Sequence, residues 1–168
     1  WNDYRDQWMS EGFANYGAAL YALTIQEDED KFVDMLEAWR KDVLNKIDVR
    51  QRLGTAYFGF TPEVLRKSDG FESGPLWIGY RLAAYDTPND YRILVYEKGA
   101  FVLHMLRMML LDWERNDDAR FREMMSSFYR RHRGGHPSTE DFLVGVEEAF
   151  GEPMRWFFDQ WVYGSAVP

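Results

Sequence analysis

The sequence predicts an all-α fold of about six helices joined by a long ordered loop. Apolar residues recur at helical spacing through most of the chain, glycine and proline gather in one central segment, and no strong strand-forming hairpin is visible. The 168 residues, 46% hydrophobic and 17% aromatic, suffice for one globular unit with a substantial core. Residues 1–168 are therefore expected to form a single helical subdomain.

The first helix is expected from about Asp6 to about Ile25. Its bulky stripe holds Met9, Phe13, Tyr16 and Leu20, and its small-residue face holds Ala14, Asn15, Ala18 and Ala22. Glu11 lies on the small-residue face, where another element can press close to it. A buried carboxylate needs a cation, hydrogen-bond donors or a metal. Taken alone, however, a mid-helix Glu more often makes a salt bridge or faces water.

The second helix follows an acidic run, Glu27 to Asp30, which favours a helix N-terminus because the helix dipole attracts negative charge. Its apolar residues recur at helical spacing to about Ile47. Residues 49–90 then lose this period and are rich in glycine, proline and aromatic side chains. Long loops in compact domains are usually functional or disordered, and the aromatics favour an ordered loop that lines a cleft.

Four further helices complete the expected fold. One runs from about Tyr91 or Val95 to about Trp113, with a buried stripe of Gly99, Leu103, Leu106, Leu110 and Trp113. Gly99 in that stripe permits close approach of another backbone. A helix at about 117–131 buries Phe121, Met124, Met125 and Phe128. Ser138 or Thr139 caps the next helix, Gly151 ends it, and a short aromatic helix closes the chain.

Composition narrows the classes of partner. The net charge of −8, from 20 basic and 28 acidic side chains, argues against a nucleic-acid backbone. No apolar run approaches the ~18 residues that a membrane span needs. The absence of cysteine excludes disulfides and Cys-ligated metals and leaves the compartment open. The chain does not begin with Met or a signal peptide, so we expect a segment of a longer protein.

The histidines and Tyr96 are the other polar residues of interest. His132 and His136 lie four apart, but two glycines between them favour a basic surface loop over a helical metal pair. His104 stands alone on a helix, where a packed or solvated ring is the usual role. A phenol such as that of Tyr96, at the start of a helix, is able to donate a hydrogen bond to a developing oxyanion. A core tyrosine with a satisfied hydroxyl is the simpler alternative.

Two segments together resemble one protein family. Residues 6–16, Asp-Gln-Trp-Met-Ser-Glu-Gly-Phe-Ala-Asn-Tyr, are similar to the segment after the zinc motif in the aminopeptidase N family of gluzincin metallopeptidases, peptidase family M1. Residues 96–100, Tyr-Glu-Lys-Gly-Ala, resemble that family's Tyr-Glu-Lys-Gly helix. The tail from Phe157 looks like the end of its catalytic domain. The resemblance implies the helical lobe of a thermolysin-like (gluzincin) catalytic domain.

The resemblance also implies site residues. Glu11 matches the third protein ligand of Zn²⁺, Tyr96 matches the tyrosine that stabilises the tetrahedral intermediate, and Tyr91 matches a second active-site tyrosine of some members. The His-Glu-x-x-His motif would lie upstream of Trp1, in a catalytic lobe that becomes this chain's partner. The expected substrate is a peptide. Ser10 departs from the commoner Asn, and a related gluzincin family with a similar Glu segment is a second possible match.

We therefore expect the parent protein to be a zinc aminopeptidase and the isolated chain to be inactive. A catalytically dead relative that serves as a binding scaffold is the alternative. Without the upstream lobe, the small-residue face around Glu11 should be exposed and should make a crystal or oligomer contact or be disordered.

Overall fold

The fold is helical, as the sequence predicted. The computed structural model of the chain describes residues 2–44, 74–83 and 90–166. Within these ranges there is no strand, only an isolated bridge between Asp112 and Asp117. The elements are η1 (Tyr4–Asp6), α1 (Gln7–Thr24), α2 (Glu29–Leu44), η2 (Leu76–Leu82), η3 (Arg92–Lys98), α5 (Gly99–Leu110), α6 (Ala119–Arg131), α7 (Thr139–Phe150) and α8 (Arg155–Trp161). None of the described helices is long and apolar enough to cross a membrane.

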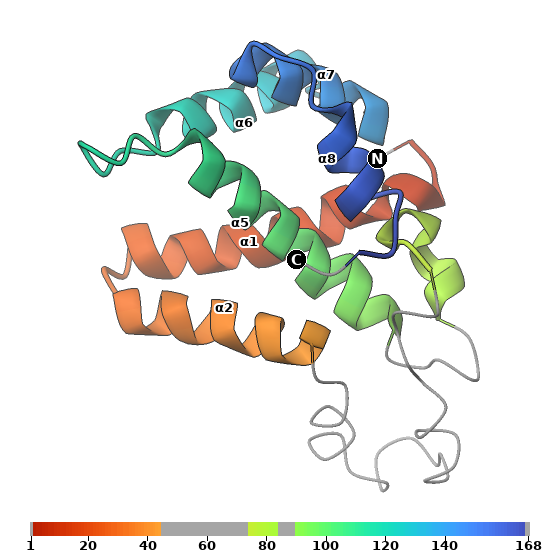
Figure 1. Ribbon diagram of the computed structural model, residues 1–168, viewed down its shortest axis with the longest axis horizontal. Coiled ribbons are helices and arrows are strands. Elements are labelled where there is room, and N and C mark those ends of the chain that lie inside the picture. The colour runs from red at the N-terminus through yellow and green to blue at the C-terminus, as the bar shows by residue number, and fades with distance from the viewer. Residues whose placement is uncertain (1, 45–73, 84–89, 167–168) are drawn as a thin grey trace, which may run out of the picture.

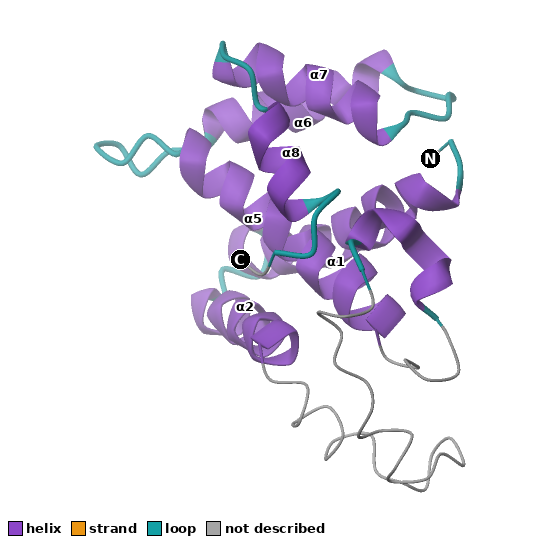
Figure 2. Ribbon diagram, turned by 45° about the vertical axis from the view of Figure 1, so that its right-hand side comes forward, coloured by secondary structure: helices purple, strands orange, loops and turns teal. Residues whose placement is uncertain are grey.

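Helix α1 is central to the fold and packs on more than one side. Figure 1 shows α1 and α2 running side by side, with α5 crossing α1. Met9, Phe13 and Tyr16 of the predicted bulky stripe are buried, and Leu20 is half-buried. A second buried side, with Trp8, Gly12 and Ala19, faces η3 and α5. Figure 2 shows α6 and α7 together on the side of the molecule away from α2.

Helix α2 agrees with its predicted amphipathic pattern. Glu29 and Asp30 lie in its first turn, and Phe32, Trp39 and Val43 are buried. Its expected last residues, after Leu44, lie outside the described residues. Most of the predicted ordered loop at 49–90, with its cleft-lining aromatics, lies there as well. Its described part, 74–83, contains the short 3-10 helix η2, in which Gly79 has a φ of 58° and packs against the backbone of Tyr4.

The predicted third helix begins close to the expected Tyr91 but ends before Trp113. It begins at Asp90, and its residues Arg92–Lys98 form a π-helix that runs directly into α5. Leu103, Leu106 and Leu110 are buried as expected. Trp113, however, is 71% exposed, so its predicted place in the buried stripe is wrong.

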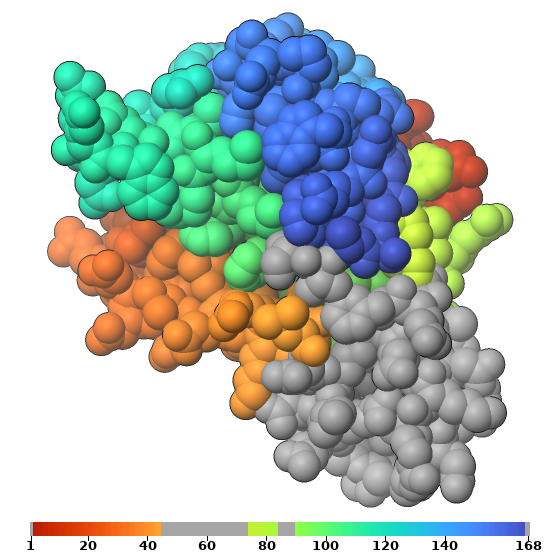
Figure 3. All heavy atoms as spheres, viewed as in Figure 1, coloured from red at the N-terminus to blue at the C-terminus, as the bar shows by residue number. Residues whose placement is uncertain are grey.

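The early end of α5 explains the exposure of Trp113. The helix stops at Leu110 because Leu111 is extended, and the Asp112–Asp117 bridge then turns the chain back. This turn projects from the body of the molecule between α5 and α6 (Figure 3).

The C-terminal helices follow local sequence signals closely. Ser138 caps α7 and forms a reciprocal capping box with Asp141. Gly151 ends α7 in the left-handed conformation, with a φ of 75°. In α6, the predicted residues Phe121, Met124 and Phe128 are buried, and Met125 is half-buried. In α8, Phe157 and Phe158 are buried.

An aromatic cluster joins these helices to α1. Phe13 and Phe142 pack edge to face with ring centroids 5.1 Å apart, and Phe142 contacts Phe128 at the same distance. Trp8 adds a third edge contact to Phe142 at 5.9 Å. Such pairs contribute about 0.5–1.5 kcal/mol each beyond their buried area. The cluster therefore fixes how α1 lies against α6 and α7.

Candidate functional site

Glu11 lies in the N-terminal half of α1, at the edge of the small-residue face. Its side chain is half-buried. Ala14 and Ala18 on the same face are exposed, whereas Ala22 is buried. The predicted exposure of this face is therefore found around Glu11 and lost towards the end of the helix. A crystal or oligomer contact over it stays a prediction.

A contact between two glycines places Glu11 against the helix that carries Tyr96. A Cβ atom added at Gly12 would lie 2.8 Å from the carbonyl carbon of Gly99, closer than real Cβ atoms approach backbone. The two helices can meet at this distance because neither residue has a side chain. Glu11 precedes Gly12 directly, and Tyr96 lies three residues before Gly99. The backbone contact predicted from Gly99 is confirmed.

Glu11, Tyr96 and Tyr91 form a hydrogen-bonded group. The Tyr96 hydroxyl donates to the Glu11 carboxylate, and the Tyr91 hydroxyl donates to the Tyr96 oxygen. The two tyrosine rings meet edge to face, with centroids 5.7 Å apart and planes at 77°. The structure thus brings together all three residues that the resemblance implied.

The electrostatics of this group keep both phenols protonated at neutral pH. Burial, followed by the negative charge and hydrogen bond of Glu11, raises the pKa of Tyr96 above its ordinary value. Burial and the neighbouring Tyr96 likewise raise the pKa of Tyr91. Both hydroxyls therefore remain hydrogen-bond donors at neutral pH.

The described residues hold only part of what a metal site requires. No group of three or more His, Asp or Glu side chains suited to a metal occurs within the described ranges. Glu11 is a carboxylate that keeps further lone pairs after accepting from Tyr96, so it is suited to serve as one ligand of a shared site. A complete site would need ligands from outside these ranges.

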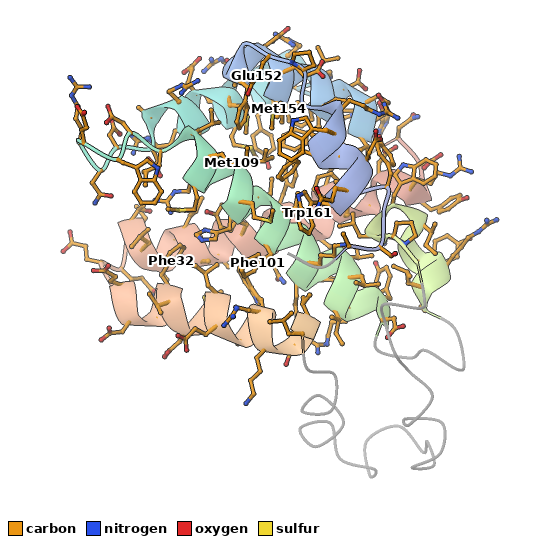
Figure 4. All side chains as sticks on the ribbon, in the orientation of Figure 1. Phe32, Phe101, Met109, Glu152, Met154 and Trp161 are labelled. Atoms are coloured by element: carbon orange, nitrogen blue, oxygen red, sulfur yellow. The ribbon has the colours of Figure 1, made fainter. Side chains whose placement is uncertain are left out.

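The histidines have other surroundings. The Nδ1 atom of His104 lies 3.2 Å from the Tyr16 hydroxyl, and its ring packs against Phe32 and Phe101. Figure 4 labels Phe32 and Phe101, two of the aromatic residues whose rings pack against His104. The His132 ring packs at a tilt against Phe128, and His136 is exposed in the turn after α6. The prediction that His132 and His136 belong to a loop is confirmed.

Sequence reasoning missed a charged cluster beside the two tyrosines. Glu97 is buried and forms an ion pair with Arg92, which also reaches Asp42 of α2 at 3.4 Å. Lys98 is 1% exposed, and its Nζ lies 3.5 Å from the Gly164 carbonyl oxygen. Burial lowers the pKa of Lys98 to about 8. The spacing of five between Arg92 and Glu97 was the available signal, but in the regular α-helix expected there residues five apart lie on different sides.

Comparison with known proteins finds relatives of one kind. Aminopeptidase M1-C of Oryza sativa subsp. japonica is 23% identical over 161 residues, which cover 96% of this chain and 15% of that protein. Aminopeptidase N of Escherichia coli is 30% identical over 80 residues, 48% of this chain and 8% of that protein. Aminopeptidase N of Caulobacter vibrioides is 30% identical over 98 residues, 58% of this chain and 10% of that protein.

The matched regions are short parts of long proteins. The chain spans about 15% of the length of the rice relative that it matches almost from end to end. No protein-family model matches the chain. No solved structure matches it either.

Proposed function

We propose that this chain, a distant homologue of the M1 aminopeptidases, forms the helical part of a zinc aminopeptidase catalytic domain. In this proposal Glu11 is a zinc ligand, Tyr96 donates a hydrogen bond to the oxyanion formed during peptide hydrolysis, and Tyr91 lies on the substrate side. The observation that carries the proposal is the hydrogen-bonded convergence of these residues from α1 and η3. Peptides are the proposed substrates.

Zinc would activate a water molecule and polarise the scissile carbonyl when bound. Zinc sites of this type use three protein ligands and leave one position open. Within this chain only Glu11 is assigned to the metal. The other two ligands and the general base are proposed to come from a His-Glu-x-x-His segment in an upstream lobe. The exposed Ala14 and Ala18 beside Glu11 leave room for that lobe to approach.

The chain's own contribution is the Tyr96 hydroxyl, which has one proton to donate. Tyr96 is protonated at neutral pH and is held by Tyr91 on one side and Glu11 on the other. A preoriented neutral donor stabilises negative charge that develops on a substrate oxygen. Because Tyr91 donates to Tyr96, it restricts the direction in which the Tyr96 hydroxyl points. Because the Tyr96 proton is donated to Glu11 in the chain as described, it would turn from Glu11 to the substrate oxygen once Glu11 binds zinc.

The ligand assignment is tested in the longer protein by Glu11→Gln. The amide keeps the size of the side chain and removes its charge, so zinc content and peptidase activity should both fall. If both persist at wild-type level, the assignment is wrong. Tyr96→Phe should retain zinc and lower kcat by about 10²–10³, since a single oxyanion donor contributes roughly that factor. Tyr21→Phe, an exposed tyrosine on α1, is the matched control.

A catalytically dead binding scaffold is the alternative outcome. Such a protein would show no peptidase activity before any substitution, and Glu11→Gln would leave its zinc content unchanged. The isolated 168-residue chain is expected to lack peptidase activity and stoichiometric zinc at micromolar concentration, because one protein ligand does not hold catalytic zinc. Isothermal titration with ZnCl₂ checks this. Tight 1:1 binding by the isolated chain would overturn the shared-site proposal.

A further inference from the structure

The segment η3, Arg92–Lys98, is a π-helix of seven residues. Most π-helical segments in proteins are single-turn bulges, and they occur frequently at functional sites. Two pairs of interacting side chains span this segment with the same separation of five residues. One pair is Tyr91 with Tyr96, and the other is Arg92 with Glu97. The two pairs are adjacent in sequence, so the same helical register brings the members of both pairs together.

Neither pair would meet in an α-helix. At 3.6 residues per turn, residues five apart point about 140° away from each other. With a rise of 1.5 Å and a radius of about 2.3 Å, their Cα atoms lie roughly 8.7 Å apart. The i→i+5 hydrogen bonding of a π-helix instead brings such residues to the same side of the helix. The ring contact of Tyr91 with Tyr96 therefore depends on the π register.

The Arg92–Glu97 ion pair opposes a return to the α register. Glu97 is buried, and its Oε2 atom has no hydrogen-bond partner among the described residues. Arg92 is thus the cation that compensates the charge of this carboxylate, and it also contacts Asp42 on α2. Loss of the π register would separate Arg92 from Glu97 and leave a buried carboxylate without its cation, which is strongly unfavourable.

We propose that Glu97 is a positioning residue, whose ion pair with Arg92 holds η3 in the π register and thereby keeps the Tyr91–Tyr96 pair directed at Glu11. The catalytic role of this ion pair rests on the proposed function, but its effect on the helical register does not. The Gly12–Gly99 contact fixes the C-terminal end of η3 against α1. The Arg92–Glu97 ion pair then determines whether the turn that precedes Gly99 adopts the π-helical or the α-helical register.

A disulfide scan tests the register directly. The chain has no cysteine, so the double variant Tyr91→Cys/Tyr96→Cys contains a single possible bridge and keeps the Arg92–Glu97 ion pair. Two cysteines with Cα atoms more than about 7 Å apart cannot be joined without backbone movement. The 91/96 pair should therefore oxidise readily in the folded chain. The matched control is Arg122→Cys/Ser127→Cys, five residues apart in the regular helix α6, which should remain reduced. Equal bridging of both pairs would overturn the assignment of the register.

The role of Glu97 is tested by NMR on the full chain. In the wild type, nuclear Overhauser contacts between the Tyr91 and Tyr96 rings should be present, and Glu97→Gln should abolish them. Asp118→Asn, which removes the carboxylate of another buried ion pair, with Arg107, should lower stability without affecting these contacts. Ring contacts that survive Glu97→Gln in a folded protein would overturn the proposal.

A second variant keeps the test decisive if Glu97→Gln does not fold. The double variant Arg92→Cys/Glu97→Cys lacks the ion pair, so its reduced form should lose the Tyr91–Tyr96 ring contacts, and a disulfide formed between the two cysteines should restore them. Contacts that are identical in both redox states would overturn the proposal. Because these measurements need neither zinc nor activity, they are independent of the proposed function. If Tyr96→Phe left peptidase activity intact, the proposed function would fail while the positioning role of Glu97 stood.

Discussion

Gly12 of α1 lies against the backbone of Gly99, where η3 passes into α5, and a Cβ atom at position 12 would come within 2.8 Å of that backbone. This contact sets the separation of two helices that are far apart in sequence. Glu11 and Tyr96 are carried on either side of it and meet as a consequence. The close packing of the two glycines and the hydrogen bond of the candidate site are therefore one structural feature.

Gly12→Ala should destabilise the fold. The added methyl group would clash with backbone, which cannot move aside as a side chain can, so we expect a loss of about 1–3 kcal/mol in the free energy of unfolding. Gly17→Ala is the matched control on the same helix, because a Cβ there meets nothing within 4 Å. It should stabilise by roughly 0.5–1 kcal/mol through helix propensity. Urea denaturation measures both. Equal effects of the two substitutions would contradict the close-contact interpretation.

A buried polar group joins the start of α1 to the start of α7. Asp6 Oδ1 accepts hydrogen bonds from the backbone N–H and hydroxyl of Thr139, and the Trp8 indole N–H donates to the Thr139 hydroxyl at 3.0 Å. Thr139→Val preserves shape and leaves the indole donor unpaired, which should cost about 1–3 kcal/mol. The Trp8 indole proton should then shift in the NMR spectrum. An unchanged indole resonance would show that the hydroxyl is not its partner.

The stability of the chain should depend on pH through His104. Burial, followed by the positive charge of Arg107, lowers the pKa of His104 to about 4, against about 6.5 in the unfolded chain. Between these values the unfolded state binds more protons, so stability is full above pH 6.5 and is lost as pH falls towards 4. The His104→Gln variant should lack this pH-dependent part of the free energy of unfolding. Its stability difference between pH 7 and pH 5 should be smaller than that of the wild type by about 1–2 kcal/mol.

Carboxylates also titrate in this range, so the comparison of the two proteins carries the result. Urea denaturation at pH 7 and pH 5 gives the free energy of unfolding of the wild type and of His104→Gln for this comparison. Parallel pH profiles for the two proteins would show that His104 is not the titrating group.

The buried Lys98 should reduce stability at neutral pH. Burial lowers its pKa to about 8, so the folded state disfavours the ammonium form. Between this value and the unfolded pKa of about 10.4, stability should rise with pH. Lys98→Met removes the buried charge and should stabilise by roughly 1–3 kcal/mol at pH 7. This gain should shrink above pH 8.

The control for this substitution is Lys31→Met, which alters an exposed lysine on α2. It should change stability by less than about 0.5 kcal/mol at either pH. Urea denaturation at pH 7 and pH 9.5 distinguishes the two variants. If Lys98→Met destabilised the chain at pH 7, the hydrogen bond to Gly164 would outweigh the cost of burial.

Features that depend on neighbouring residues were predictable from the sequence. The Ser138 cap and the Gly151 stop are local because each side chain or backbone conformation acts within one helical turn. Trp113 was misplaced because the periodic pattern continues past Leu110, while the Asp112–Asp117 bridge ends the helix. The bridge depends on a backbone conformation that hydrophobic spacing does not encode.

The sequence by itself determined the all-α class, the bulky stripe of α1, and the resemblance that singled out Glu11, Tyr96 and Tyr91. Periodicity and short motifs carry this information because they need no long-range contact. Only the tertiary structure decided that these residues meet. Their meeting depends on the Gly12–Gly99 contact and on the π register of η3, and both arise from packing between segments distant in the chain.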